Sequence, residues 1–99
     1  MNFPQVVKTV FQTLQQHGEV RQHDATGELK GCSYEFTLDR FWFWLFPLYF
    51  IGKPNLFKIC ARIHKSAKHP FHERIISSNE EIIPKLEELI ALLKEDLSK

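Results

Sequence analysis

Glycine and cysteine are both scarce in this chain of 99 residues, which has four glycines and two cysteines. The glycines are spread among predicted turns and strands, so they form neither a glycine-rich phosphate loop nor the tight turn that presents a catalytic nucleophile. No other stretch carries a strong catalytic or nucleotide-binding signature. We therefore predict that the protein is not an enzyme and uses no cofactor.

The two cysteines are predicted to lie on opposite faces of a sheet. Cys32 belongs to the inward set of its strand, and Cys60 belongs to the outward set of its own strand. Side chains on opposite faces cannot be joined by a disulfide. Two reduced cysteines are typical of an intracellular protein, and the first residues lack the pattern of a secretory signal. The sequence therefore predicts a cytoplasmic location.

Long apolar runs and a large charge excess are also missing. The longest apolar run, 41–52, is far shorter than the roughly 18 to 20 residues of a membrane-spanning helix. The net charge of +1 gives no overall attraction to nucleic acid or to an anionic membrane. We therefore predict no membrane span, and any binding surface has to be sought in local features.

A metal site is not predicted, although Cys60, His64, His69 and His72 follow one another closely. Cys60 and His64 fall on one predicted strand, where residues four apart are separated by about 13 Å and cannot share a zinc ion. His69 and His72 would need a partner from elsewhere in the chain. A position at the surface is the usual interpretation of histidines in a loop.

Both ends of the chain have helical periodicity. Near the start, apolar residues recur at helical spacing and Gly18 follows as a stop signal, which predicts a helix over 3–17. Near the end, a possible capping sequence precedes a stripe of leucine and isoleucine, which predicts a helix over 79–97. Pro84 favours a slightly later start for this second helix.

Between the helices the pattern is that of an antiparallel sheet of four to five strands. The fold class is therefore predicted as α+β, a two-layer sandwich in which an N-terminal and a C-terminal helix cover one sheet face. A chain of this length suits a single domain over 1–99. Alternation of apolar and polar residues, β-favouring composition and turn signals predict strands over 19–23, 29–38, 41–51, 56–64 and 71–77.

The third of these strands is unusual because it is apolar on both faces. Pro47 cannot donate to the sheet, so the strand must end there, form a bulge or lie at an edge. Three exposed rings, at about 150 to 250 Å² each, would approach the largest apolar patch usual on a monomer. The strand has two sets of apolar side chains, Phe41, Phe43 and Leu45 on one face, and Trp42, Trp44 and Phe46 on the other. One alternative to exposure is that a loop, a terminal segment or strand twist buries both sets.

Our first functional hypothesis is a protein-binding surface made by this aromatic strand, 41–50. The simplest partner is a second copy of the chain in a homodimer, with rings at the buried centre and basic residues at the rim. A heterologous protein partner, with the domain acting as a small regulator, is the broader form of this hypothesis. The predicted protein-binding residues are Phe41, Trp42, Phe43, Trp44 and Phe46.

The second hypothesis is a platform for single-stranded nucleic acid, in which outward rings stack on bases and nearby cations hold phosphates. No recognition motif supports it, and Glu35 and Asp39 lie close to the proposed surface. Basic residues are nevertheless concentrated in the segment that follows the aromatic strand. The candidates for phosphate contact are Lys53, Lys58, Arg62, His64, Lys65 and Lys68.

Overall fold

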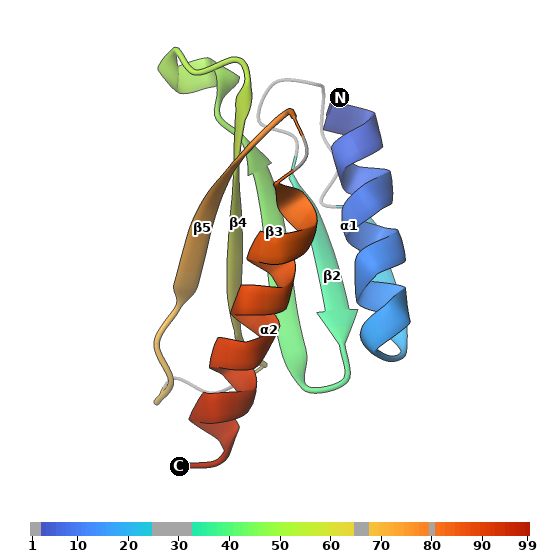
Figure 1. The fold of residues 1–99 in the computed structure, drawn as a ribbon, viewed down its shortest axis with the longest axis vertical. Helices are drawn as coiled ribbons and strands as arrows, with labels where there is room; N and C mark the ends of the chain where they lie inside the picture. The colour runs from blue at the N-terminus through green and yellow to red at the C-terminus, as the bar shows by residue number, and fades with distance from the viewer. Residues whose placement is uncertain (1–2, 25–32, 65–67, 80) are drawn as a thin grey trace.

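The computed structural model describes residues 3–24, 33–64, 68–79 and 81–99 (Figure 1). Two long helices enclose the strands in chain order, and a short 3-10 helix, η1, interrupts them after the third strand. The elements are α1 (Phe3–His17), β1 (Val20–Asp24), β2 (Tyr34–Leu38), β3 (Phe41–Pro47), η1 (Tyr49–Ile51), β4 (Leu56–Ile63), β5 (His72–Ser77) and α2 (Ile82–Leu97).

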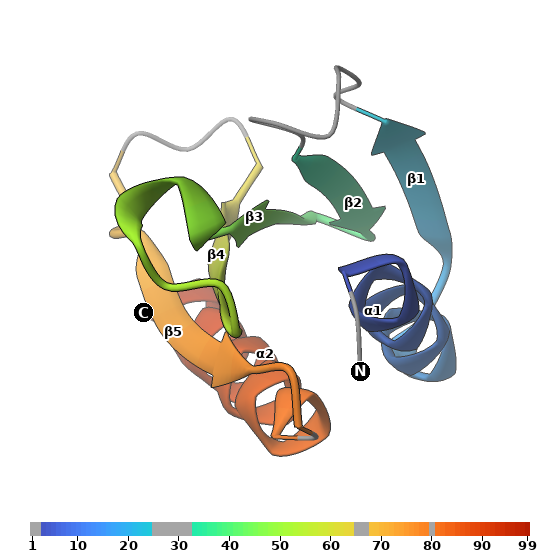
Figure 2. The ribbon, with the colours of Figure 1, turned by 90° about the horizontal axis from the view of Figure 1, so that it is seen from above.

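The strands form one five-stranded antiparallel sheet in the order β1-β2-β3-β4-β5. Both helices lie on the same side of this sheet, which bends around them (Figure 2). Helix α1 packs against β1 and β2, α2 packs against β4 and β5, and the helices contact each other. This confirms the predicted α+β class with an N-terminal helix, an antiparallel sheet and a C-terminal helix.

The core lies between the helices and the covered face of the sheet. Apolar stripes at helical spacing on α1 and α2 meet alternate residues of β2, β3, β4 and β5, because both periodicities place their apolar positions on one side. Fully buried members are Val6, Val10, Leu14, Phe36, Phe43, Leu45, Ile59, Ala61, Ile76, Leu86, Leu89 and Leu93.

Strand β3 is shorter than predicted. The predicted bounds of 41–50 and 41–51 for the aromatic strand are too long, because the ladder ends at Pro47, which pairs with Phe57. Of the three alternatives predicted for Pro47, the end of the strand is the one confirmed. Pro47 has no N–H to continue the ladder. The chain turns into η1, and Gly52 closes this turn at φ +84°, in the left-handed region that favours glycine.

Other element boundaries differ slightly from the predictions. Helix α2 begins at Ile82 rather than at residue 79, so Pro84 falls in the first helical turn, where a missing N–H costs no helical hydrogen bond. The predicted later start is thereby confirmed. The first part of the strand predicted over 29–38 lies outside the described residues, as does Cys32, and β2 is described from Tyr34.

The register of the sheet determines which side chains surround the rings of β3. Asp39 and Arg40 connect β2 to β3 in a two-residue hairpin, and Asp39 has a positive φ of 51°. Trp44 therefore lies between Glu35 on β2 and Cys60 on β4, and Trp42 lies opposite Thr37 and Arg62 in the same way.

Strand β5 directs polar side chains toward α2. The Nε2 atom of His72 lies 2.7 Å from Oδ2 of Asp96, and Arg74 makes an ion pair of 2.7 Å with Glu88. The hydrogen bond from His72 holds the pKa of the Asp96 carboxyl below its usual range, against the opposing effect of burial. These contacts connect the edge of the sheet to the second helix. None of the helices in the described part of the chain is long and apolar enough to cross a membrane.

Candidate functional site

The open face of the sheet, opposite the helices, carries an unusual group of rings. Along β3 the odd-numbered side chains are buried in the core, whereas the even-numbered ones are half-buried on the open side. Phe41 and Phe43 therefore belong to the core. We call the open-side group the aromatic face, and its rings are Trp42, Trp44, Phe46 and Phe71.

The rings of the aromatic face contact one another and a histidine. Trp42 and Trp44 stack with their centroids 4.8 Å apart, and the His64 ring lies 4.8 Å from Trp42. Phe71, just before β5, lies 5.6 Å from Trp44. The strand therefore does not leave three isolated rings in water, since neighbours from β4 and the β4–β5 connection cover part of each tryptophan.

Arg62 on β4 is placed over these rings. Its guanidinium carbon lies 4.8 Å from the Trp44 centroid, 5.1 Å from that of Phe71 and 5.3 Å from that of Trp42. Each distance is within the range of a cation–π attraction. Among the described residues, no carboxylate forms an ion pair with Arg62, and its buried Nε has no hydrogen-bond partner.

The two indole N–H groups differ in their surroundings. The Nε1 atom of Trp44 donates a hydrogen bond of 3.2 Å to Oε1 of Glu35 on β2. The Nε1 atom of Trp42 is buried and has no partner in the described part of the chain. Buried donors normally find a partner, so Trp42 and Arg62 are two places where this face has unused hydrogen-bonding capacity.

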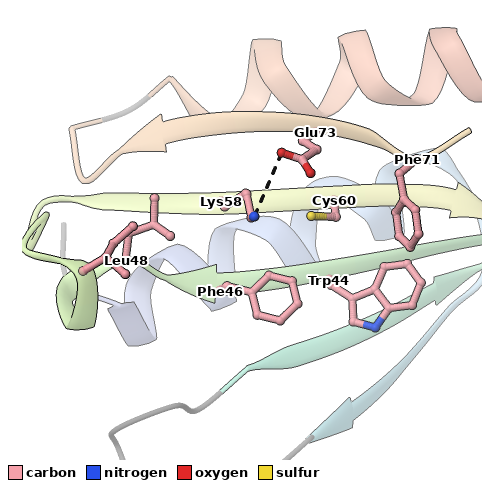
Figure 3. A pocket seen from close by; sticks show the side chains of 8 residues that line it. Trp44, Phe46, Leu48, Lys58, Cys60, Phe71 and Glu73 are labelled. Atoms are coloured by element: carbon pink, nitrogen blue, oxygen red, sulfur yellow. Dashed lines mark ion pairs between the residues drawn. The ribbon is translucent and has the colours of Figure 1, made fainter.

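A groove follows the aromatic face along β3 and β4 (Figure 3). Its volume is about 640 Å³, and its walls are mostly apolar. Figure 3 shows Leu48 near the η1 end and Trp44 with Phe71 at the other end, with Phe46, Lys58 and Cys60 between them. The lining side chains are Trp44, Phe46, Leu48, Ile51, Lys58, Cys60, Phe71 and Glu73.

The polar side chains of the groove interact mainly with one another. Lys58 Nζ lies 4.0 Å from Glu73 Oε2, a long contact between two partly exposed side chains. Burial raises the pKa of the Cys60 thiol, and the nearby Glu73 carboxylate adds to this rise, while Lys58 opposes it. Cys60 points to the open face as predicted, yet it is only 7% exposed. Burial and the raised pKa both disfavour the reactive thiolate form of this cysteine.

The opposite half of the open face has a different character. Between β1 and β2 a smaller hollow of about 230 Å³ is lined by Glu19, Arg21, Thr37 and Asp39. These side chains are polar and largely exposed, as in an ordinary solvated surface. The apolar character of the open face is therefore concentrated over β3, β4 and β5.

The residues predicted to hold phosphates do not form one cluster. Lys53 is exposed in the turn before β4, and Lys68 is exposed beyond the other end of that strand. Lys58 faces Glu73, and His64 packs on Trp42. Lys65 lies outside the described residues. Of the predicted set, Arg62 is the cation that the structure places within the aromatic face.

Three residues of this region were not singled out by the sequence prediction, namely Ile51, Phe71 and Ile75. These residues are 58%, 55% and 50% exposed, which is unusually high for large apolar residues. Alternation along β5 was the available signal, since it places Phe71 and Ile75 on the side opposite Ile76. The polar residues His72 and Arg74 on the covered side hide this pattern in the sequence.

Comparisons of the chain with protein-family models, with curated proteins and with solved structures give no match. Among the described residues, no group of three histidine, cysteine or acidic side chains is placed to hold a metal ion. Of the histidines considered above, His64 contacts Trp42 and His72 contacts Asp96. The aromatic face is therefore the feature from which a function can be inferred.

Proposed function

We propose that the protein is a binding domain whose aromatic face packs against a protein partner, most simply a second copy of the same chain. The observation that carries this proposal is the position of the exposed apolar side chains. Ile51 and Phe71 line the groove, and Ile75 lies beside it across the β4–β5 pair. They lie on the open side of the sheet with the half-buried rings, and we call this group the apolar area. Exposed apolar side chains gathered on one face are typical of interaction surfaces.

The composition of the face resembles the energetic centre of a protein interface. Tryptophan and arginine are enriched among the residues that contribute most to binding, and they act best where a partner excludes water. Trp42, Trp44 and Arg62 already pack on one another in the single chain. This pre-organisation lowers the entropy lost on association, because the side chains need little further ordering.

A second copy is a suitable partner because the charges around the groove have both signs. Lys58 faces Glu73 at 4.0 Å, Arg62 lies over the rings, and Glu35 accepts a hydrogen bond from Trp44. In a two-fold contact each patch meets itself, so a cation on one copy can approach an acid on the other. A face with charges of one sign would repel its own copy.

The test is the molar mass in solution, measured by light scattering over a concentration series. We expect the wild-type chain to shift from monomer to dimer as concentration rises, with little dependence on salt, since most of the buried area is apolar. The variant Ile75→Glu should remain monomeric, because it places a charge in the apolar area.

A matched control is Ile83→Glu. Ile83 is 46% exposed, close to the 50% of Ile75, but it lies on α2 on the other side of the sheet. This variant should dimerise like the wild type. A wild-type chain that stays monomeric throughout the series would contradict self-association, and equal loss of the dimer in both variants would contradict the assignment to the aromatic face.

Single-stranded nucleic acid binding is the second candidate, supported by the combination of rings with Arg62. It is less well supported than the protein interface. Arg62 lies on the ring faces that bases would need, and Lys53 and Lys68 are at opposite ends of β4. An oligonucleotide added to the light-scattering series distinguishes the two. A gain of mass that falls steeply with salt would favour nucleic acid.

A further inference from the structure

The groove of the aromatic face has the dimensions of a small-molecule site. Pockets for such ligands usually enclose about 300 to 1,000 Å³ and are lined by apolar side chains with a few polar groups. The groove has a volume of about 640 Å³ and combines aromatic and aliphatic walls with Lys58, Glu73 and Cys60. Lys58 and Glu73 face each other at 4.0 Å, so they largely balance each other's charge within the groove.

One positive charge, that of Arg62, lies beside the groove and has no acid as a partner among the described residues. The Arg62 guanidinium packs on Trp44 and Phe71, and both of these rings line the groove. Within the described part of the chain, it forms no ion pair with a carboxylate, and its Nε is buried without a hydrogen-bond partner. A cation held in place by rings and without an acid beside it favours an anionic ligand.

We infer that the groove binds an unbranched apolar carboxylate, chemically a medium-chain fatty acid, with its carboxylate at Arg62 and its hydrocarbon chain directed toward Leu48 and Ile51. Arg62 and the groove-lining Lys58 are four residues apart on β4, which corresponds to about 13 Å of extended chain and suits a hydrocarbon of roughly ten carbons. A single guanidinium matches a ligand with one negative charge. The Glu73 carboxylate in the wall disfavours a second one.

This inference concerns the face that we propose for self-association, but it does not depend on the dimer. The Arg62 guanidinium and the apolar wall of the groove are both present in the single chain. Ile75, which tests the dimer, is not one of the groove-lining side chains. Ligand binding and dimer formation can therefore be removed by different substitutions.

The experiment is a titration of the protein with decanoate, below the concentration at which decanoate forms micelles and at a protein concentration that is monomeric by light scattering. Tryptophan fluorescence is the readout, because the chain has two tryptophans and both belong to the aromatic face. We expect a saturable change with decanoate. Decanol should bind about tenfold more weakly, since it lacks the charge-assisted contact. Acetate and decyltrimethylammonium should give no saturable change.

Substitutions of Arg62 test whether this residue contacts the carboxylate of decanoate. Arg62→Gln should lower the affinity for decanoate about tenfold and leave that for decanol unchanged, and Arg62→Lys should keep part of the preference for the acid. The matched control is Arg21→Gln, which removes a positive charge from the polar half of the same face. Calorimetry provides a second readout, because replacing Arg62 alters the surroundings of both tryptophans.

Three results would overturn the inference. They are the absence of a saturable response to decanoate, equal affinities for decanoate and decanol, and equal effects of Arg62→Gln and Arg21→Gln. Ile75→Glu separates this proposal from the previous one. Decanoate binding in that variant, combined with a wild-type chain that never dimerises, would support the ligand site and contradict the dimer. A wild-type dimer without a decanoate response would support the dimer and contradict the ligand site.

Discussion

Strand β3 carries large apolar side chains on both faces, and the two faces have different surroundings. On the covered face, Phe43 and Leu45 are fully buried between the helices and the sheet. On the open face, Trp42, Trp44 and Phe46 remain half-buried, with rings and a guanidinium as neighbours. One strand therefore supplies the core with one set of residues and the proposed binding surface with the other.

The polar groups show the same contrast. On the covered face, the β5 side chains His72 and Arg74 each meet an acid of α2. On the open face, Arg62 meets aromatic rings and no acid of the described chain. Buried polar groups are usually satisfied within the fold, and this cation without an acidic partner is one of the observations on which the proposed binding surface rests.

The largest effect on stability is expected from Phe43→Ala on the covered face. Removal of a fully buried ring leaves a cavity and should lower the free energy of unfolding by about 3–5 kcal/mol. Urea unfolding followed by circular dichroism measures the loss. Phe43→Leu keeps most of the volume and should cost much less. A loss below about 1 kcal/mol would be comparable to that of a surface substitution. It would contradict the role of Phe43 in the core.

Trp44→Ala on the open face should destabilise the fold less than Phe43→Ala does, but it should weaken dimer formation more. The variant loses the stacking on Trp42, the contact with Arg62 and the hydrogen bond to Glu35, which together correspond to about 2–3 kcal/mol. The same variant should lose the dimer in light scattering, whereas Phe43→Leu should keep it. If Trp44→Ala destabilised the fold as strongly as Phe43→Ala, the two faces of β3 would not differ in the way we propose.

The pair between His72 and Asp96 predicts a pH dependence on the covered face. The pKa of Asp96 is lowered in the folded protein, so its ionised form stabilises the fold above the unfolded value of about 3.9, and this contribution is lost as pH falls through the folded pKa. Asp96→Asn should therefore be less stable than the wild type near neutral pH, and the difference should shrink in acid.

Urea unfolding at a series of pH values measures this difference. Glu87→Gln, which changes an exposed carboxylate on the same helix, is the control and should show a smaller dependence. A stability difference between Asp96→Asn and the wild type that stays constant from neutral pH to strong acid would mean that the carboxylate does not stabilise the fold through its charge.

The smallest difference between the two faces is expected in the alkylation rate of Cys60, in the wall of the groove. Burial raises the pKa of its thiol, so alkylation by iodoacetamide at neutral pH should be at least about tenfold slower than in urea. The measurement uses a Cys32→Ser background, so that one thiol reacts. Decanoate should slow the reaction further if it fills the groove. Rapid alkylation of the folded protein would show that the groove wall is open at this position.

Much of the fold could be predicted because its signals are local. The helix Phe3–His17 follows from apolar residues at helical spacing, and β4 follows from strict alternation. Alternation also separates Trp42 and Trp44 from Phe41 and Phe43. The end of β3 was less predictable, because the rings after Pro47 favour a strand while the proline prevents the ladder from continuing.

The sequence by itself determined which side chains of each strand share a face, since the period of a strand is a property of the backbone. Only the tertiary structure decided which face of β3 the helices cover, because both faces of this strand are apolar and the choice depends on how both helical stripes are buried together. It also decided that Phe71 and Arg62 meet on Trp44, although they come from different segments. Such contacts depend on strand register and on the path of the connecting loop, and they have no local pattern in the sequence.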